Sequence, residues 1–155
     1  MRLKSQRGIG LLELMLSLAI IAILLVMATR YFASARQGQQ VASAVSLLQA
    51  IMAATNNYAI ANGNSASSLT GLSQLIKGNY LPAGMSNTGP WGGQVTVSYS
   101  SQSGYPAAVS VTIPNVSSSG ACAELIAAIK AEVVPGTTPS CAPGSTGFTA
   151  ILGGG

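Results

Sequence analysis

The stretch Gly-Ile-Gly-Leu-Leu-Glu-Leu-Met at residues 8–15 opens an apolar run that continues to Ala28. Within residues 9–28 the only ionisable side chain is Glu13. As a helix this run would be ~30 Å long, which matches the thickness of the hydrocarbon core of a bilayer. The sequence therefore predicts a helix that can cross a membrane.

The charges around this run predict its orientation and single out one residue. Arg2, Lys4 and Arg7 precede the run and no acidic residue does, so the positive-inside tendency predicts a cytoplasmic N-terminus and an exported remainder. A carboxylate in a lipid-facing segment costs roughly 3 kcal/mol unless it finds a partner. The chain has no Lys or Arg one helical turn after Glu13, so a partner has to come from elsewhere.

The sequence Arg-Gly-Ile-Gly-Leu-Leu-Glu-Leu at residues 7–14 resembles the class III signal of type IV prepilins. That signal has a short basic leader ending in Gly, a hydrophobic first mature residue, and Glu as the fifth residue from the cut. The resemblance implies that prepilin peptidase cleaves between Gly8 and Ile9 and that the new amino group of Ile9 is methylated. It also implies that Glu13 pairs with the N-terminal amine of a neighbouring subunit, since opposite charges attract strongly in a low dielectric.

Two simpler interpretations share a basic start and an apolar run. A secretory signal peptide has an apolar core of only ~7–15 residues, which is shorter than the run here. Neither a signal peptide nor a plain membrane anchor uses an acid inside its hydrophobic segment. These differences favour a type IV pilin-like protein over an unrelated single-pass protein.

Composition restricts the chemistry. The 155 residues suffice for one modest domain besides the membrane segment, and only 6% of them are charged. There is no His and no Asp, so a Ser-His-Asp triad, acid-base catalysis and metal sites lack their usual groups. We expect no enzyme, no cofactor and no metal. Three of the seven basic residues lie before Gly8, and the remaining balance predicts no specific nucleic-acid partner.

The exported part contains both cysteines, Cys122 and Cys141. Their separation fits neither a thioredoxin-like motif nor a zinc site. In an oxidising periplasm we expect a structural disulfide, and closing this loop is worth roughly 3 kcal/mol in the chain-entropy model.

The helical pattern continues beyond the membrane segment. Arg30 and Arg36 mark the outer interface, and no proline occurs before Pro82. Two adjacent rows of mainly apolar residues follow at spacings of three and four, which predicts an amphipathic helix with a broad buried face. The rows are Val41, Val45, Leu48, Met52, Thr55 and Ala59, and Ala44, Leu47, Ile51, Ala54 and Tyr58. One helix over about residues 9–61 would be ~80 Å long, with a protruding first half and a second half that packs against a domain.

The remaining chain predicts a small α+β domain. A turn at residues 62–68 is followed by a short helix around Leu72–Ile76 that Gly78 closes. Alternating residues in 95–99 and 109–113 predict an antiparallel hairpin. Before it, Trp91 lies in a Gly- and Pro-rich tight turn, where we expect it at the edge of the core.

The C-terminal part predicts a second helix over about 121–133, capped by Ser118 or Ser119 and ended by Pro135. An irregular loop over 135–147 and a final strand over 148–152 follow. The order of these elements, with Asn-Thr-Gly-Pro-Trp-Gly-Gly at 87–93, resembles the short type IVb pilins of thin pili. It implies a pilin fold: a long N-terminal helix packed against a small antiparallel sheet, a second short helix and a C-terminal disulfide loop.

The resemblance implies four segments: a leader at 1–8, a transmembrane and filament-core half-helix at 9–29, an amphipathic half-helix at 30–61, and a globular head at 62–155. The leader of eight residues and the first mature residue Ile9 leave the type IVa and IVb subclasses both open. Glycosylation and filament symmetry are not indicated.

We expect a structural subunit, and specifically the major pilin, of a type IV pilus. The implied partners are further copies of the chain, prepilin peptidase, and the assembly ATPase with its platform. We expect the precursor in the inner membrane and the assembled subunit in an extracellular pilus. The alternatives are a type II secretion pseudopilin, a minor pilin, and a membrane-anchored periplasmic binding module using Trp91 and Tyr99. The major pseudopilin usually binds calcium through Asp, and this sequence has no Asp. Adhesion, conjugation, motility and DNA uptake all stay open.

Overall fold

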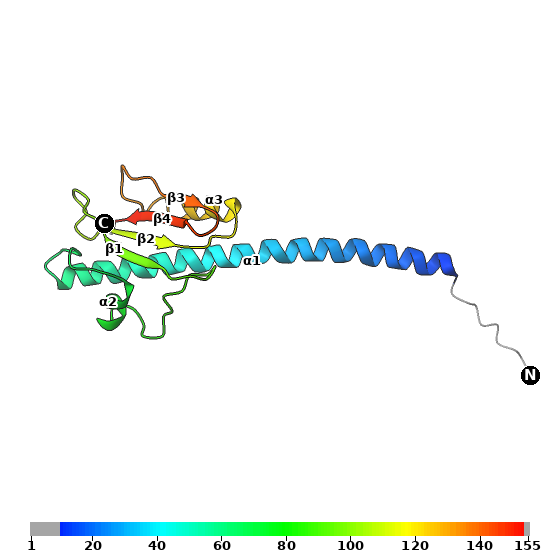
Figure 1. The fold of residues 1–155 in the computed structure, drawn as a ribbon, viewed down its shortest axis with the longest axis horizontal. Helices are drawn as coiled ribbons and strands as arrows, with labels where there is room; N and C mark the ends of the chain where they lie inside the picture. The colour runs from blue at the N-terminus through cyan, green and yellow to red at the C-terminus, as the bar shows by residue number, and fades with distance from the viewer. Residues whose placement is uncertain (1–9, 154–155) are drawn as a thin grey trace, which may run out of the picture. The chain divides into compact units, whose positions relative to one another are not determined.

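Helix α1, Leu11–Ala61, is the longest element of the computed structural model, which describes residues 10–153 (Figure 1). It contains no proline, so every residue can donate its backbone N–H to the helical ladder. The predicted first helical residue, Ile9, lies outside the described residues. The chain divides into two compact units, one that ends at Gln37 and one that begins at Gly38.

In the unit that begins at Gly38, α1 has one buried face. Its buried residues recur at helical spacing, and they are Val41, Ala44, Leu48, Ile51, Ala54, Thr55, Tyr58 and Ala59. Gln39, Ser43, Ser46 and Asn57 are exposed. The predicted amphipathic stripe is therefore confirmed, and it belongs to the core of the head.

The sheet in the described residues has four antiparallel strands in the order β1-β2-β4-β3. The strands are β1 Thr96–Tyr99, β2 Val109–Ile113, β3 Ser140–Ala142 and β4 Gly147–Leu152. β1 and β2 form the predicted hairpin, and β4 confirms the predicted final strand. Pairing of Val111 with Ala150 turns apolar side chains of β2 and β4 to the same face.

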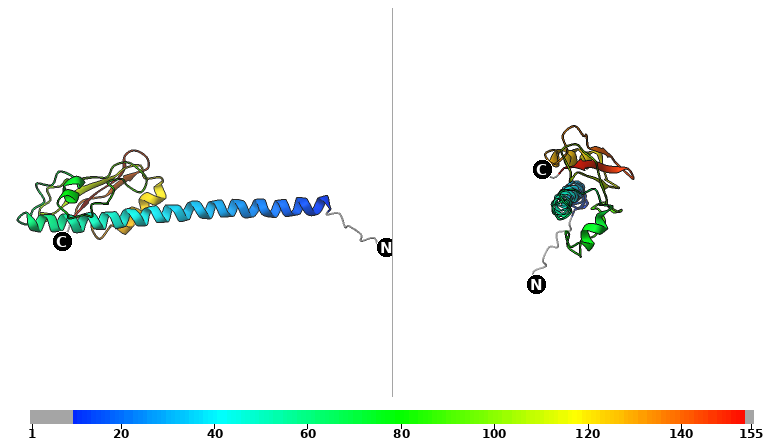
Figure 2. Two further views of the ribbon diagram at one scale, coloured as in Figure 1. Left: turned by 90° about the horizontal axis from the view of Figure 1, so that it is seen from below. Right: turned by 90° about the vertical axis from the view of Figure 1, so that its left-hand side faces the viewer.

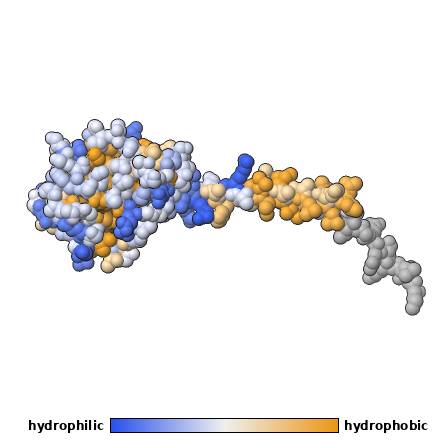
Figure 3. Space-filling view, viewed as in Figure 1, coloured by the Kyte–Doolittle hydropathy of each residue, from blue (hydrophilic) through white to orange (hydrophobic). Residues whose placement is uncertain are grey.

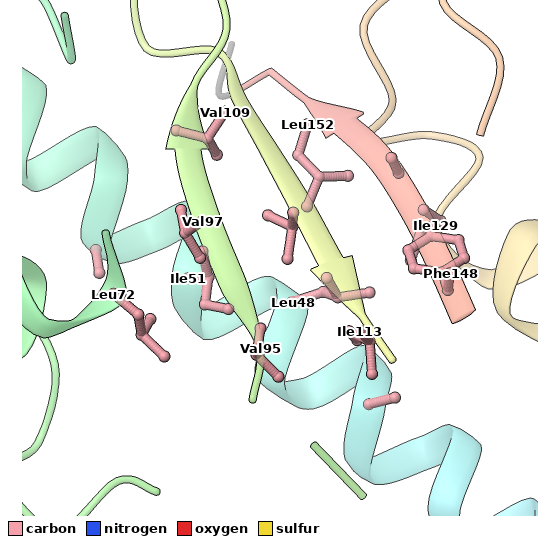
Figure 4. Close-up of a cluster of buried hydrophobic side chains, with 14 of the residues drawn as sticks. Leu48, Ile51, Leu72, Val95, Val97, Val109, Ile113, Ile129, Phe148 and Leu152 are labelled. Atoms are coloured by element: carbon pink, nitrogen blue, oxygen red, sulfur yellow. The ribbon is translucent and has the colours of Figure 1, made fainter. Parts of the chain in front are cut away.

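The core lies between this sheet and α1. The sheet covers one side of α1 and helix α2, Leu72–Lys77, lies on another side (Figures 1 and 2). Leu48 and Ile51 of α1 point toward the strands, and Ile113 and Phe148 of the sheet belong to the same buried cluster (Figure 4). All four side chains are at most 1% exposed, so close packing of the strands on α1 holds the head together.

Helix α3, Ser119–Ala128, begins as predicted but ends earlier. The Ser118 hydroxyl accepts from the Ala121 N–H at 3.1 Å, which makes Ser118 the N-cap. The prediction that the helix reaches Val133 was wrong. The backbone N–H of Val134 donates to Ile151 O (3.0 Å) and that of Gly153 donates to Glu132 O (3.1 Å), so residues 132–134 pair with β4 in place of a further helical turn.

The prediction of an irregular loop over residues 135–147 was also wrong in one part, because this segment contains strand β3. The three residues of β3 pair with β4 through Cys141 and Phe148 and their neighbours. Three residues are too few to give an alternating pattern in the sequence. The strand exists because β4 offers a free edge and Cys141 is held beside it.

Candidate functional site

The first half of α1 presents its apolar side chains to the surroundings. Among the described residues, α1 alone is long and apolar enough to cross a membrane, and its most apolar 18-residue window has a mean hydropathy of 2.7 with no part buried. Leu12 is 83% exposed and Leu25 64%. Figure 3 shows this half as a nearly continuous apolar surface, whereas most of the head surface is polar. A surface of this kind needs lipid or other apolar helices around it.

Three polar side chains interrupt residues 11–29, and two of them are satisfied within the helix. Ser17 Oγ donates to Leu14 O at 2.9 Å and Thr29 Oγ1 donates to Val26 O at 3.0 Å. Such bonds make a hydroxyl compatible with hydrocarbon. Glu13 is the third, and its carboxylate has no hydrogen bond or ion pair with another residue in 10–153.

Glu13 lies in the first turn of α1, with its backbone N–H donating to Gly10 O at 2.9 Å. Its side chain is exposed. The next basic residue along the helix is Arg30, which is ~25 Å away at the rise of an α-helix. A cation for Glu13 must therefore come from residues outside 10–153 or from another molecule. Of the predicted processing residues, Gly8 and Ile9 lie outside the described part of the chain.

Aromatic and basic side chains follow the apolar surface. Tyr31 is 80% exposed and Phe32 65%. The guanidinium carbon of Arg36 lies 6.0 Å from the centre of the Phe32 ring, within reach of a cation–π contact. Arg30 adds a second positive charge. Aromatic rings and cations together are typical of the membrane–water interface.

The two cysteines form the disulfide that the sequence predicts. Cys122 lies in the first turn of α3 and Cys141 in β3, with their Cα atoms 5.6 Å apart, a usual separation for a disulfide. Cys122 is buried in the core and Cys141 packs against it. The bridge ties α3 to the edge strand of the sheet.

Trp91 lies in a tight turn at the edge of the core. The Gly89 N–H donates to Gly93 O at 3.0 Å, which closes the turn. Gln40 Nε2 donates to Pro90 O at 3.3 Å, which links the turn to α1. The Trp91 ring packs against the core, as predicted, and its Nε1 is buried without a partner among the described residues. Tyr99, the other residue of the alternative binding surface, is also partly buried against the core.

Two features of the head are not predicted from the sequence. Tyr58 of α1 bonds both Ser68 and Gln74, and so joins α1 to the α1–α2 loop and to α2. Gly147 starts β4 at φ +62, close to the backbone of Ile113 and Pro114. In a single sequence nothing at Tyr58 or Gly147 indicates which distant residues they contact. Within residues 10–153 no group of three or more His, Cys, Asp or Glu side chains lies together.

Comparison with known proteins gives two family matches. The family model described as PilS N terminal matches residues 33–146, well over half of the chain. The prokaryotic N-terminal methylation motif matches residues 3–29, a range that contains Gly8, Ile9 and Glu13. None of the curated proteins and none of the solved structures gives a significant match.

Proposed function

We propose that this chain, which belongs to the PilS N-terminal family, is the major structural subunit of a type IV pilus. The chain is a type IV pilin-like protein with a pilin fold. The methylation motif implies processing by prepilin peptidase, a precursor anchored in the membrane and assembly into a pilus. Pilin-family domains are structural, which supports a role without catalysis.

The observation that carries this proposal is the isolation of Glu13. It is the polar side chain of residues 11–29 that finds no partner in 10–153, and it lies in the half of α1 whose most apolar window has no buried part. In the proposed filament the exposed helices pack against one another in place of lipid, through van der Waals contacts and a few polar contacts. The cleaved and methylated amine of Ile9 in a neighbouring subunit then neutralises Glu13. Each pair sets the axial position of one subunit on the next.

This proposal assigns a role to each segment. Residues 1–8 are the leader, which is cut off between Gly8 and Ile9. Residues 9–29 first span the inner membrane and later form the filament core, with the N-terminus toward the cytoplasm. Residues 30–61 carry the head, and 62–155 complete it. The partners are further copies of the chain, prepilin peptidase, and the ATPase-driven assembly platform.

The test replaces Glu13 by Leu or Gln in cells that carry the assembly machinery. Both variants should enter the membrane in normal amount, and sheared surface filaments should be lost. Glu124→Gln is the matched control, because Glu124 is an exposed carboxylate on α3, and it should give filaments at the wild-type level. A wild-type filament yield from Glu13→Leu would end the proposal.

Mass spectrometry of the sheared filaments tests the processing and the major role. The chain should begin at N-methylated Ile9 and should dominate the filament by amount. A chain that retains Met1 would contradict the proposed cut. A trace of the chain in filaments made mainly of another protein would point to a minor pilin, and its absence from surface filaments would point to a pseudopilin.

A further inference from the structure

A pocket of about 410 Å³ opens in the head between the C-terminal part of α1 and the loop that joins β1 to β2. Its walls include Asn56 and Ile60 of α1, Asn64 after α1, and Tyr105 and Pro106 of the strand-joining loop. All of these residues belong to the unit that begins at Gly38. The volume falls in the range of small-molecule sites.

The polar groups of the pocket are free to bind a ligand. The side-chain amides of Asn56 and Asn64 and the hydroxyl of Tyr105 make no hydrogen bond to another residue within 10–153. Asn56 and Tyr105 are partly buried. Asn64 is exposed. Three residues whose side chains can donate and accept thus line one pocket without protein partners.

The walls of the pocket are held in place by backbone contacts. The Ala66 N–H donates to Pro106 O at 3.0 Å, which joins the loop after α1 to the strand-joining loop. The N–H of Tyr105 donates to Gln102 O (3.1 Å), and its carbonyl accepts from Ala108 N (3.0 Å). The Tyr105 ring also lies against Gly153, where an added Cβ would come within 2.8 Å of it. A preformed pocket binds at a lower entropic cost.

The lining selects the chemical class of the ligand. No charged residue lines the pocket, so an anion or cation would lose its hydration without gaining a counter-charge. The Tyr105 ring, Pro106 and Ile60 offer carbon surface, and the two amides and the hydroxyl offer donors and acceptors. A sugar ring presents the same combination, with C–H faces and hydroxyl groups that both donate and accept. We propose that this pocket binds a neutral monosaccharide unit.

This inference does not depend on polymerisation, because every lining residue belongs to one head. It adds a binding site for a neutral monosaccharide unit to the proposed structural role of the subunit. The site is distinct from Trp91 and Tyr99, which pack against the core.

The test uses the full-length chain in zwitterionic micelles and saturation-transfer difference NMR. The probes are methyl β-D-galactopyranoside, methyl α-D-glucopyranoside and N-acetyl-D-glucosamine, with glucose 6-phosphate as the charged comparison. At least one neutral sugar should bind with a dissociation constant on the order of millimolar. Glucose 6-phosphate should bind more weakly than methyl α-D-glucopyranoside.

The variants are Asn56→Ala and Asn64→Gly. Alanine suits the helix at position 56, and glycine accepts the φ of +62 that Asn64 adopts, so both should leave the fold intact. Each should weaken binding on the order of tenfold. Asn57→Ala removes an exposed amide from the same helix and should leave binding unchanged.

Three results would overturn the inference. In the first, no neutral sugar gives a difference signal. In the second, the signal persists unchanged in both Asn56→Ala and Asn64→Gly while circular dichroism shows a native fold. In the third, the phosphorylated sugar binds more tightly than the neutral ones, which would place the binding at a basic surface elsewhere.

Discussion

The side-chain amide of Gln74 on α2 donates a 2.8 Å hydrogen bond to the hydroxyl of Tyr58 on α1. The same hydroxyl lies 2.7 Å from Ser68 Oγ, and the Tyr58 ring meets Tyr80 edge-on at 5.5 Å. One aromatic residue therefore attaches α2 and both of its flanking loops to the long helix. Tyr58 is 6% exposed, and both of these bonds are partly buried.

Tyr58→Phe should destabilise the head by about 1 kcal/mol, because it leaves the amide of Gln74 and the hydroxyl of Ser68 without their shared partner. Chemical denaturation of the full-length chain in micelles, followed by near-UV circular dichroism, measures this. Tyr31→Phe is the control, since Tyr31 is 80% exposed and should lose nothing. Equal stability of the two variants would contradict the role given to Tyr58.

Reduction of the Cys122–Cys141 bridge should lower the free energy of unfolding by roughly 3 kcal/mol, because the open chain gains the entropy of an unconstrained loop. Denaturation with and without dithiothreitol measures the difference. β3 should lose its hydrogen-exchange protection before β2, since β3 is a short edge strand tied to α3 by this bridge. A double Cys122→Ser and Cys141→Ser variant should not respond to the reductant, and a wild-type chain that ignores it would refute the prediction.

Gly147→Ala should be strongly destabilising. At φ +62 a Cβ costs about 1 kcal/mol, and here it would also overlap Ile113 O and approach Pro114 Cα within 2.6 Å. Displacing the backbone of Ile113 and Pro114 should add about 2 kcal/mol. Gly136→Ala isolates the first effect, because Gly136 has φ +86 with nothing within 4 Å of the added Cβ. The prediction fails if the two variants unfold at the same denaturant concentration.

Ser118→Ala should cost about 1 kcal/mol, because it removes the oxygen that accepts the Ala121 N–H at the start of α3. Ser119→Ala is the neighbouring control, since Ser119 is the exposed first residue of the helix. Thermal unfolding of the three proteins in the same micelles gives the comparison. If Ser119→Ala lowered the thermal stability more than Ser118→Ala, Ser118 would not be the N-cap.

Local patterns in the sequence determined much of this protein. The apolar run with Glu13, the helical stripe from Val41 to Ala59, the N-cap at Ser118 and the alternating β2 residues each depend on neighbours within a few positions. Such signals survive in a single sequence because helices and half-buried strands repeat with short, known periods.

Only the tertiary structure decided how the C-terminal part is arranged. β4 lies between β2 and β3. Residues 132–134 pair with β4 and so end α3 early, and the three residues of β3 also pair with β4. Gly147 is required because β4 passes close to Ile113, and the pocket beside Tyr105 exists because two distant loops meet at Ala66 and Pro106. These contacts join residues far apart in the chain, where no local period records them, and the free energy of pairing and packing outweighs local helix preference.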